Sequence, residues 1–529
     1  MLYPIGIQSF EEIRNGGYVY VDKTALIYRL TSTGKYYFLS RPRRFGKSLL
    51  VSTMEAYFSG RKELFEGLAM ASLEKDWVSY PVLHLDLTGA AYLSIDELYS
   101  KFNSFLSKYE ERYDIRTGEH VASVRFENII DTAYRKTGQK VVILIDEYDT
   151  PIQQGHVSGF YDTIIGFMRN LFSGGLKDNP HLSYGFLTGI LRVAKESIFS
   201  GLNNLKINSI LDERYSEYFG FTSSEVHEMA DYYHASDKYQ ELCDWYDGYL
   251  FGNTEIFNPW SVIGYFNNNC RPKAFWQSTG SNDIIREVLA SATPDIMERL
   301  ELLMKGESFV THIDTGVIYP QIQNDPSSVY SFLLVAGYLK AVSCDQSYGE
   351  DYMCEVALPN KEISFVYSKE ILSQLENIIP RSVAIAIQEA IYKVDSDSLQ
   401  KTLEKFLLQT ISFHDAADET FYHGLILGMC AVMDNSYRIT SNREAGDGRF
   451  DIQMLPLNKR LPGILIELKA GKDRSETQLE DLANVALQQI NDRAYSVDLQ
   501  AMNVTSIIKI GIAFSGKRTR IAAERQNIE

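Results

Sequence analysis

The chain has 529 residues, which corresponds to about three domains at roughly 100 to 200 residues each. A composition of 45% hydrophobic and 23% charged residues excludes a disordered chain, because enough apolar surface is present to build large cores. The formal charge of -17 excludes a protein that covers nucleic acid or an anionic membrane with its whole surface.

The acidic charge is unevenly distributed along the chain. Residues 411–529 contain 16 acidic and 14 basic side chains, whereas residues 1–410 contain 53 acidic and 38 basic ones. The C-terminal part is therefore close to neutral, and it is the part of the chain that can approach a phosphate backbone locally.

No CxxC pair occurs among the five cysteines, which are Cys243, Cys270, Cys344, Cys354 and Cys430. This pattern is typical of reduced, mostly buried thiols and not of a disulfide framework or a zinc site. The opening MLYPIGIQSFEEIR lacks the features of a signal peptide, and no apolar run approaches the ~18 residues of a membrane span. We therefore expect a cytoplasmic protein without a membrane partner.

The first 215 residues alternate short apolar runs with segments of helical periodicity, which predicts an α/β domain with a mostly parallel sheet. From 216 to 410 the chain changes to helical segments separated by aromatic loops such as WYDGYLFG, which predicts a mainly helical linker or lid region. After 411 the alternation returns and predicts a second α/β domain. The expected strands are residues 36–40, 81–87, 141–145, 183–188, 450–455, 463–468 and 506–514, with a helix over 475–493.

The segment YYFLSRPRRFGKS leads from an apolar strand through a basic loop into a helix, which is the order of elements in a P-loop. Gly46 allows backbone N–H groups to approach a phosphate, Lys47 reaches its oxygens, and the Ser48 hydroxyl binds Mg²⁺. The GxxxxGK pattern places its first glycine at position 41, where this chain has Arg41. A basic turn that caps the helix is the alternative interpretation.

The strand at 141–145 ends in Asp146 and Glu147. In P-loop ATPases an Asp holds Mg²⁺ through water and an acidic neighbour orients the attacking water, although an Asp here also fits a helix cap. Because this pair and the GKS loop occur in the right order within one α/β region, we predict binding of ATP and Mg²⁺.

Polar residues near the two loops are further candidates for nucleotide contacts. Thr188 ends the fourth strand, where a side chain can sense the γ-phosphate, and Arg192 can supply positive charge to the transition state. For Thr188 a helix-capping role is an equally supported alternative, and for Arg192 a surface position without a role in the site is one. We predict that Arg43 and Arg44 contact phosphate or a partner, in preference to a structural role.

A second constellation lies in GDGRFDIQMLPLNKRLPGILIELKAG, which reads as two strands joined by a turn. Asp451 lies on the first strand, and Glu467 and Lys469 lie on one face of the second because their spacing is two. Charges at the end of a buried apolar run are costly unless they are paired or bound to a metal. Two carboxylates that bind Mg²⁺ and a lysine that positions water are typical of metal-dependent nucleases, and an internal salt-bridge cluster is the alternative.

The motifs together resemble the bacterial AAA-ATPase-like proteins that carry a C-terminal nuclease-like domain of the PD-(D/E)XK superfamily. The similarity runs nearly end to end and includes RPRRFGKS, LIDEYDTP, LTGILRVAKESIFSGLNNL, WYDGYLFG, NPWSVIGYF, FWQSTGSN and ALPNKEI. It implies a P-loop NTPase domain at 1–215, a mainly helical region at 216–410 and a restriction-endonuclease-like α/β domain at 411–529. It also implies that Arg41 is compatible with a phosphate-binding loop.

The resemblance adds two residues to the C-terminal site. Glu419 lies on a helix that the superfamily uses for a further acidic metal ligand, and Gln489 lies in ALQQI, where the family has a glutamine that reaches the active site. A structural role is an equally supported alternative for each. His414 and His423 are nine residues apart, which fits neither HxxxH nor HExxH, so both are expected to be structural.

Two hypotheses of function follow. In the first, ATP in the N-terminal domain controls Mg²⁺-dependent cleavage of DNA or RNA by the C-terminal domain, and a homo-oligomer is plausible because AAA-type sites often borrow an arginine from a neighbour. In the second, the chain is a nucleotide-dependent switch that binds nucleic acid or a partner with little turnover. Near the end, a basic cluster forms either a patch that contacts nucleic acid or a solvated terminal helix, and consists of Lys517, Arg518, Arg520 and Arg525.

Overall fold

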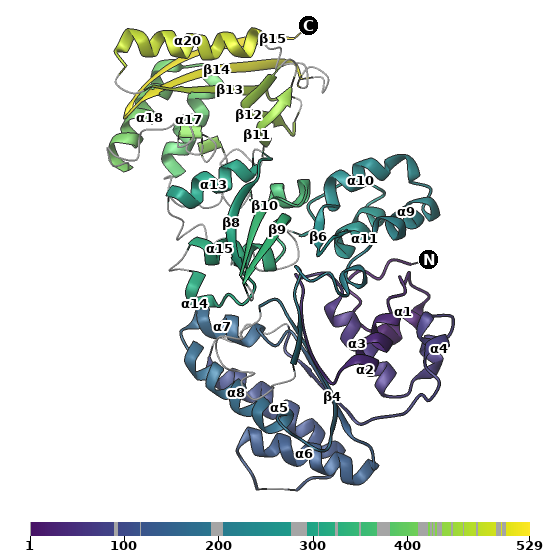
Figure 1. Ribbon diagram of the computed structural model, residues 1–529. Helices are drawn as coiled ribbons and strands as arrows, with labels where there is room; N and C mark the ends of the chain where they lie inside the picture. The colour runs from purple at the N-terminus through teal and green to yellow at the C-terminus, as the bar shows by residue number, and fades with distance from the viewer. Residues whose placement is uncertain are drawn as a thin grey trace. The chain divides into compact units, whose positions relative to one another are not determined.

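The structure is a computed structural model in which the chain divides into two compact units (Figure 1). The first unit contains Met1–Gly280 and Ser308–Val366, and the second contains Ser281–Glu307 and Tyr367–Glu529. The predicted divisions after residues 215 and 410 stay predictions. The described residues are 2–88, 94–116, 118–191, 205–276, 294–304, 306–322, 326–348, 351–367, 381–410, 422–423, 426, 429–430, 436–445, 448–458, 460–471, 474–492, 499 and 504–528.

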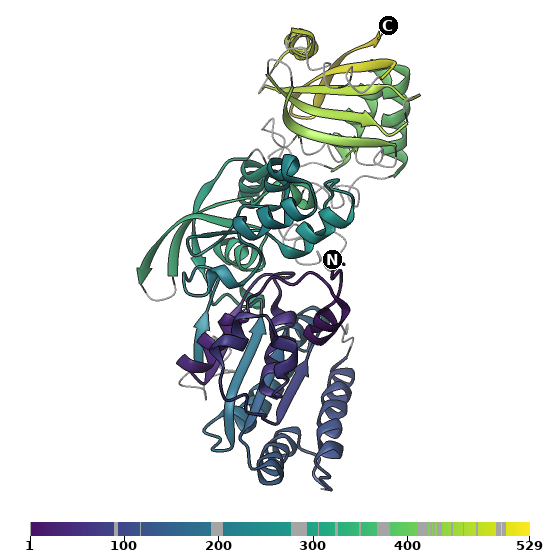
Figure 2. The same cartoon turned by 90° about the vertical axis from the view of Figure 1, so that its right-hand side faces the viewer.

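A five-stranded parallel sheet with the order β2-β3-β4-β1-β5 forms the centre of the first unit. Its strands lie side by side in purple to blue in Figure 2. Every residue of β1 and β3 is buried, as expected when helices cover both faces of a parallel sheet. The four predicted strands are confirmed, and β5 is an additional, short one. The strands are β1 (Tyr36–Ser40), β2 (Val82–Asp86), β3 (Val141–Asp146), β4 (Leu182–Gly189) and β5 (Leu205–Asn208).

Helices surround this sheet, and in Figure 1 α1 to α4 gather on one side of β4 while α7 and α8 lie on the other. Helix α3 packs against β2 and β3, so the loop between β1 and α3 opens at the carboxyl edge of the sheet. That edge is where parallel α/β folds bind their ligands. The helices are α1 (Phe10–Gly16), α2 (Ala25–Thr33), α3 (Lys47–Phe58), α4 (Ala69–Leu73), α5 (Ile95–Arg112), α6 (Ala122–Thr137), α7 (Thr150–Ser158) and α8 (Tyr161–Leu176).

The middle of the chain is mainly helical, as predicted, and also contains two small antiparallel sheets that the sequence pattern did not indicate. The first sheet pairs β6 with β7, and the second has the order β8-β10-β9. The elements are α9 (Ser223–Tyr232), α10 (Tyr239–Tyr246), β6 (Tyr249–Phe251), β7 (Thr254–Ile256), α11 (Pro259–Asn267), α13 (Pro294–Met304), β8 (Phe309–Asp314), α14 (Tyr319–Ile322), α15 (Pro326–Val335), β9 (Lys340–Tyr348) and β10 (Asp351–Ala357).

The expectation that all five cysteines are free thiols is wrong for one pair. Cys344 and Cys354 form a disulfide. They lie directly opposite each other on the antiparallel strands β9 and β10, with a Cα–Cα distance of 4.1 Å. Sequence spacing alone does not reveal this proximity, because it depends on the register of two strands that were predicted as helical structure.

A five-stranded mixed sheet with the order β11-β12-β13-β14-β15 forms the second unit, and only β13 and β14 run parallel. One face packs on α17 and α18, where Leu403 and Phe406 join Ile464 and Ile466 in a single core. The other face carries α20. The elements are α17 (Arg381–Lys393), α18 (Ser396–Thr410), β11 (Tyr437–Ala445), β12 (Gly448–Pro456), β13 (Gly463–Ala470), α20 (Glu476–Asp492), β14 (Ser506–Ser515) and β15 (Arg518–Asn527).

The C-terminal strands and helix predicted from sequence are confirmed, but the suggested terminal helix is wrong. Residues 518–527 form β15, which pairs with β14 along its full length. The sequence IAAER has good helix propensity, but pairing with the edge of β14 decides the outcome. Within the described part of the chain, no helix has the length and apolar character needed to cross a membrane.

Glu362 is a fully buried carboxyl group in the first unit. It accepts hydrogen bonds from the Ser261 hydroxyl at 2.7 Å and from the Trp276 N–H at 2.9 Å. Burial nevertheless raises the pKa of Glu362 from 4.5 to about 7. The folded state therefore holds this proton over a pH range in which the unfolded chain has lost it.

The pKa of Glu362 predicts a pH dependence of stability. Because the folded pKa is raised, the free energy of unfolding falls as pH rises from about 4.5 to 7, by up to about 3 kcal/mol. Glu362→Gln should flatten that slope in urea titrations at pH 5, 6, 7 and 8. The control is Glu228→Gln, which changes an exposed residue of α9 and should keep the wild-type slope. Equal slopes in all three proteins would contradict the prediction.

Two candidate active sites

The predicted phosphate-binding loop, residues 41–46, folds as a turn that leads directly into α3. Gly46 has φ 83°, a left-handed conformation that a side chain disfavours, and α3 begins at Lys47. The Lys47 ammonium is buried and donates to the carbonyl oxygens of Arg41 and Pro42, at 3.0 Å each. It also lies 3.0 Å from Glu147 Oε1. The lysine is thus held at the mouth of the loop by groups that a phosphate oxygen can replace.

Strands β3 and β4 bring polar side chains to the same place. Thr188 Oγ1 donates to Asp146 Oδ1 at 2.5 Å, and the Ser48 hydroxyl lies close enough to this carboxylate to lower its pKa. Burial and the neighbouring charge of Glu147 raise the pKa of Asp146. The hydroxyl groups of Ser48 and Thr188 act in the opposite direction and lower it. The structure therefore brings together Ser48, Asp146 and Thr188. Hydroxyl and carboxylate oxygens are the ligands that Mg²⁺ prefers, so this group fits the predicted ion.

Glu147 follows Asp146 in a strained conformation. Its φ of 51° is left-handed, and its N–H donates to Thr188 Oγ1 at 3.2 Å. Strain of this kind in a residue other than glycine is concentrated at functional sites. The conformation directs the Glu147 carboxylate to Lys47 instead of along the strand.

Arg41, which replaces the expected first glycine, is a structural residue. Its guanidinium is completely buried and donates to the carbonyl oxygens of Ser40 at 2.7 Å and Ser209 at 2.8 Å. It also donates to the Asn208 side chain at 2.6 Å. Burial lowers the pKa of Arg41 to about 9, so the group is still charged at neutral pH. Arg41 thus ties the start of the loop to the end of β5.

These contacts predict that Arg41→Gly, although it restores the GxxxxGK pattern, destabilises the protein. Removing the guanidinium leaves buried carbonyl oxygens unpaired and a cavity, which should lower the free energy of unfolding by about 3 kcal/mol. Urea unfolding measures the change. Arg116→Gly, at a side chain that is 92% exposed, is the control and should differ little from wild type. A fully stable Arg41→Gly protein would contradict the assignment.

The other arginines predicted for this site make protein contacts. Arg43 Nη2 donates to Gln153 Oε1 at 3.1 Å, and the Arg44 guanidinium lies 4.5 Å from the centre of the Trp260 ring. Their predicted contacts with phosphate stay predictions. Arg192 lies outside the described residues.

Asp149 is a candidate that the sequence pattern did not single out. It is buried and accepts hydrogen bonds from the N–H groups of Ile190 and Leu191, at 2.9 Å each. Burial, with the charge of Glu147, raises the pKa of Asp149 to about 6. Asp149 fixes the segment that follows Thr188. The signal that could have identified it is a second aspartate in LIDEYDTP, three residues after Asp146.

The second candidate site lies on the face of the C-terminal sheet that carries α20. Glu467 Oε1 accepts hydrogen bonds from Lys469 Nζ at 3.2 Å and from Gln489 Nε2. Asp451 Oδ2 accepts a hydrogen bond from the Leu468 N–H at 2.7 Å, which places both carboxylates at adjacent positions of β12 and β13. The structure thus brings together Asp451, Glu467, Lys469 and Gln489, and their roles as catalytic or metal-binding residues stay predictions.

Glu467 is 2% exposed, and its Oε2 is buried without a hydrogen-bond partner among the described residues. Burial and the charge of Asp451 raise the pKa of Glu467 to about 7, while Lys469 opposes the shift. A buried carboxylate oxygen without a donor beside a second carboxylate fits a divalent cation. Among the described residues there is no cluster of three or more metal-binding side chains, so water or substrate oxygens would complete the coordination.

Other predicted C-terminal residues lie outside the site or outside the described residues. Glu419 and His414 are not among the described residues. The His423 ring lies 3.1 Å from the Asp451 carbonyl oxygen through Nε2, a contact with the main chain that agrees with a structural role.

Three members of the basic cluster make contacts within the protein. Arg520 lies 3.4 Å from Glu404 and 3.2 Å from Glu476. Arg518 donates to the Arg474 carbonyl oxygen, and Arg525 donates to the Tyr392 carbonyl oxygen, at 2.6 Å each. Their contacts hold β15 against α17, α18, α20 and the residues just before α20.

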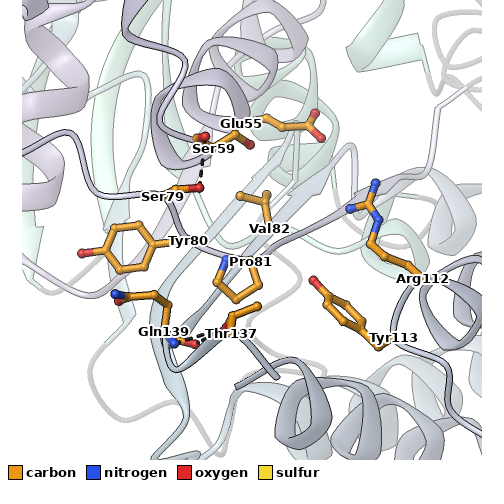
Figure 3. A pocket seen from close by; sticks show the side chains of 10 residues that line it. All are labelled: Glu55, Ser59, Ser79, Tyr80, Pro81, Val82, Arg112, Tyr113, Thr137 and Gln139. Carbon is orange, nitrogen blue, oxygen red and sulfur yellow. Dashed lines mark hydrogen bonds between the residues drawn. The ribbon is translucent and has the colours of Figure 1, made fainter. Parts of the chain in front are cut away.

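A cavity of about 390 Å³ lies away from both candidate sites (Figure 3). It is found where α3 ends and β2 begins, so α3 separates it from Gly46. Ser79 Oγ donates to the Ser59 carbonyl oxygen at 3.2 Å in its wall. The lining residues are Glu55, Ser59, Ser79, Tyr80, Pro81, Val82, Arg112, Tyr113, Thr137 and Gln139.

Two parts of the chain match known protein families. Residues 4–199 match the family model for predicted AAA-ATPase, and residues 417–524 match the model of the PD-(D/E)XK nuclease superfamily. A protein of Azotobacter chroococcum mcd 1, named "Uncharacterized protein in vnfD 5'region", is 29% identical over 529 residues, 97% of this chain and 96% of that protein. A solved structure of the Aeropyrum pernix ORC1 protein in complex with DNA covers 66% of this chain and 93% of that chain, with 12% identity. Its TM-score of 0.26 is too low to carry an argument.

Proposed function

The chain combines an AAA-ATPase-like domain with a PD-(D/E)XK nuclease superfamily domain, and from this we propose that ATP binding and hydrolysis control metal-dependent cleavage of nucleic acid. The observation that carries the nuclease half is the buried Oε2 of Glu467, which has no partner among the described residues and lies beside Asp451. The nucleotide half is supported by the convergence of Lys47, Ser48 and Asp146 at one end of the sheet.

In the N-terminal site, each residue has a distinct role. Lys47 donates to phosphate oxygens once Glu147 and the loop carbonyls release it. Ser48 and Asp146 hold Mg²⁺, which when bound neutralises charge on the phosphates. The carboxylate of Glu147, once freed from Lys47, orients water for hydrolysis, and Thr188 keeps Asp146 and Glu147 in place through its hydroxyl.

In the C-terminal site, Asp451 and Glu467 hold the divalent cation, preferably Mg²⁺, which when bound polarises the phosphodiester. Lys469 is 3.2 Å from Glu467 and can stabilise negative charge on the phosphate or position water. Gln489 donates to the same Glu467 oxygen and fixes the carboxylate so that Oε2 remains directed to the ion. DNA and RNA share the phosphodiester and both remain substrates of this proposal.

A nucleotide-dependent switch without nuclease turnover is the second candidate. One observation favours it: Glu147, the residue proposed to orient water, forms an ion pair with Lys47 at 3.0 Å. A site that keeps this pair hydrolyses bound nucleotide slowly, because Glu147 is not available to orient water. The two candidates therefore differ in whether phosphate is released.

The test uses the purified full chain with end-labelled single-stranded DNA, double-stranded DNA and RNA, with Mg²⁺ or Mn²⁺ and with or without ATP. The proposal expects labelled fragments that require metal and disappear in Asp451→Asn, together with phosphate release from ATP. Asp481→Asn, at an exposed position of α20, is the matched control. If no substrate is cut in any condition, the nuclease half is wrong. If ATP raises the melting temperature but no phosphate is released, the switch is the correct function.

A further inference from the structure

Phe45 precedes Gly46 in the phosphate-binding loop, but its side chain is buried in the middle region. It is 1% exposed. Its ring centre lies 4.9 Å from that of Tyr249, 5.0 Å from that of Phe251 and 6.5 Å from that of Trp276. The aromatic motif WYDGYLFG, to which the proposed chemistry gives no role, therefore receives a side chain of the loop.

Two arginines of the same loop also contact aromatic rings of the middle region. The Arg44 guanidinium lies over Trp260, and the Arg41 guanidinium lies 4.7 Å from the ring centre of Phe219 and 5.3 Å from that of Phe251. Together these rings form an aromatic socket, which consists of Phe219, Tyr249, Phe251, Trp260 and Trp276.

The socket is itself held rigidly. The Trp276 ring lies nearly parallel to that of Tyr249, with ring centres 6.2 Å apart, and the main-chain N–H of Trp276 donates to the buried Glu362. A Cβ atom at Gly337 would lie 2.7 Å from Cβ of Pro42 in the loop and 3.4 Å from the Trp276 ring, so the backbone of Gly337 packs closely against both. Segments far apart in the sequence thus approach the loop closely, and they belong to the same compact unit.

The loop needs such support because of its own backbone. Arg44 has φ 69° and Gly46 has φ 83°, so two of three consecutive residues are left-handed and one of them carries a side chain. A left-handed arginine is unfavourable in isolation. Complete burial of a phenylalanine side chain next to it is a larger, favourable effect. Gly46 tolerates its left-handed conformation by itself, whereas the left-handed Arg44 lies next to the buried side chain of Phe45.

We propose that the aromatic socket sets the conformation of the phosphate-binding loop, with Phe45 as the positioning residue that makes nucleotide affinity depend on the middle region. The conformational part stands on the contacts alone, and the affinity part rests on the proposed ATP site. Phe45 does not contact the nucleotide in this proposal. It acts through the backbone of residues 44 to 47.

The first experiment measures hydrogen exchange of the backbone amides of Arg41 and residues 43–48 in the full chain without nucleotide. Phe251→Ala changes the socket and leaves the loop sequence intact, and it should speed exchange of these amides at least tenfold. Phe58→Ala is the matched control, because Phe58 is buried at the opposite end of α3 and packs on Tyr80 and Tyr184. Wild-type exchange in Phe251→Ala, or equal acceleration in Phe58→Ala, overturns the proposal.

The second experiment measures ATP dissociation constants by calorimetry. Phe45→Ala and Phe251→Ala should weaken ATP binding about tenfold or more, Phe45→Leu should recover part of the affinity, and Phe58→Ala should stay within about twofold of wild type. Phe251→Leu serves if Phe251→Ala is not recovered folded. If the wild type binds no ATP, the proposed function fails, whereas hydrogen exchange still decides whether the socket sets the loop.

Discussion

Glu467→Gln should lose metal-dependent cleavage by at least about 100-fold while making the metal-free protein more stable at pH 8. The amide keeps the hydrogen bonds to Lys469 and Gln489 but cannot bind a cation as a carboxylate does. Its stabilising effect has a separate origin, because Glu467 is buried beside Asp451 and the folded state raises its pKa to about 7. Ionisation of this group above that pH therefore opposes folding.

The sign of the stability change depends on pH. A raised folded pKa means that stability is lost as pH rises from about 4.5 to 7, so the variant should gain about 2 kcal/mol at pH 8 and little at pH 4.5. Urea unfolding in EDTA measures the gain, and a cleavage assay with Mg²⁺ measures the loss. Glu480→Gln, at an exposed position of α20, should change neither.

A substitution that lowers activity and raises stability identifies a residue that is retained for function at a cost in stability. If Glu467→Gln is less stable than wild type in EDTA at pH 8, Glu467 belongs to an internal salt bridge with Lys469, which was the alternative interpretation of the motif. Loss of cleavage alone would not separate these cases, because a damaged fold also loses activity.

Lys47→Ala should weaken ATP binding by at least about 100-fold, because it removes a charged donor from the phosphate site. For the wild type, ATP at a hundredfold excess over its dissociation constant should stabilise the folded state by about 2.7 kcal/mol, and the variant should show almost none of this. Thermal unfolding with and without ATP and Mg²⁺ measures the difference. Lys62→Ala, an exposed lysine shortly after α3, is the control.

The same variant has a second expected effect without nucleotide. Lys47 is bonded to Glu147 and to two loop carbonyl oxygens, so Lys47→Ala leaves a carboxylate and two acceptors unpaired and should destabilise the nucleotide-free protein. If Lys47→Ala binds ATP with wild-type affinity, the assignment of Lys47 to the nucleotide site is wrong, whatever the stability of the variant.

The charged and hydroxyl residues of the two proposed sites could be predicted from the sequence, because their chemical type and spacing form recognisable motifs. The structure places Lys47 and Ser48, which begin the helix after β1, near Asp146 at the end of the buried strand β3. It places Asp451 on β12 beside Glu467 and Lys469 on the neighbouring strand β13. Spacing along such strands determines which side chains meet.

Residues that act through distant contacts could not be predicted in this way. Arg41 and Phe45 were read as loop residues, although both are buried by segments about 165 to 235 positions away. Cys344 and Cys354 are brought together by the register of two strands that the sequence periodicity did not predict. In β15, the edge of a neighbouring strand outweighed helix propensity, which is a tertiary effect that local sequence does not contain.

The order in which the chain enters the two compact units determines how the protein can be divided. Residues 281–307 fold with the second unit, and the chain then returns to the first for residues 308–366 before leaving it again. No single cut of the polypeptide releases either unit intact. A fragment that begins at residue 411 would lack α17 and α18, whose Leu403 and Phe406 fill one side of the nuclease-like core. Tests of the two proposed activities therefore require point substitutions in the complete chain, because truncation would confuse loss of a site with loss of a fold.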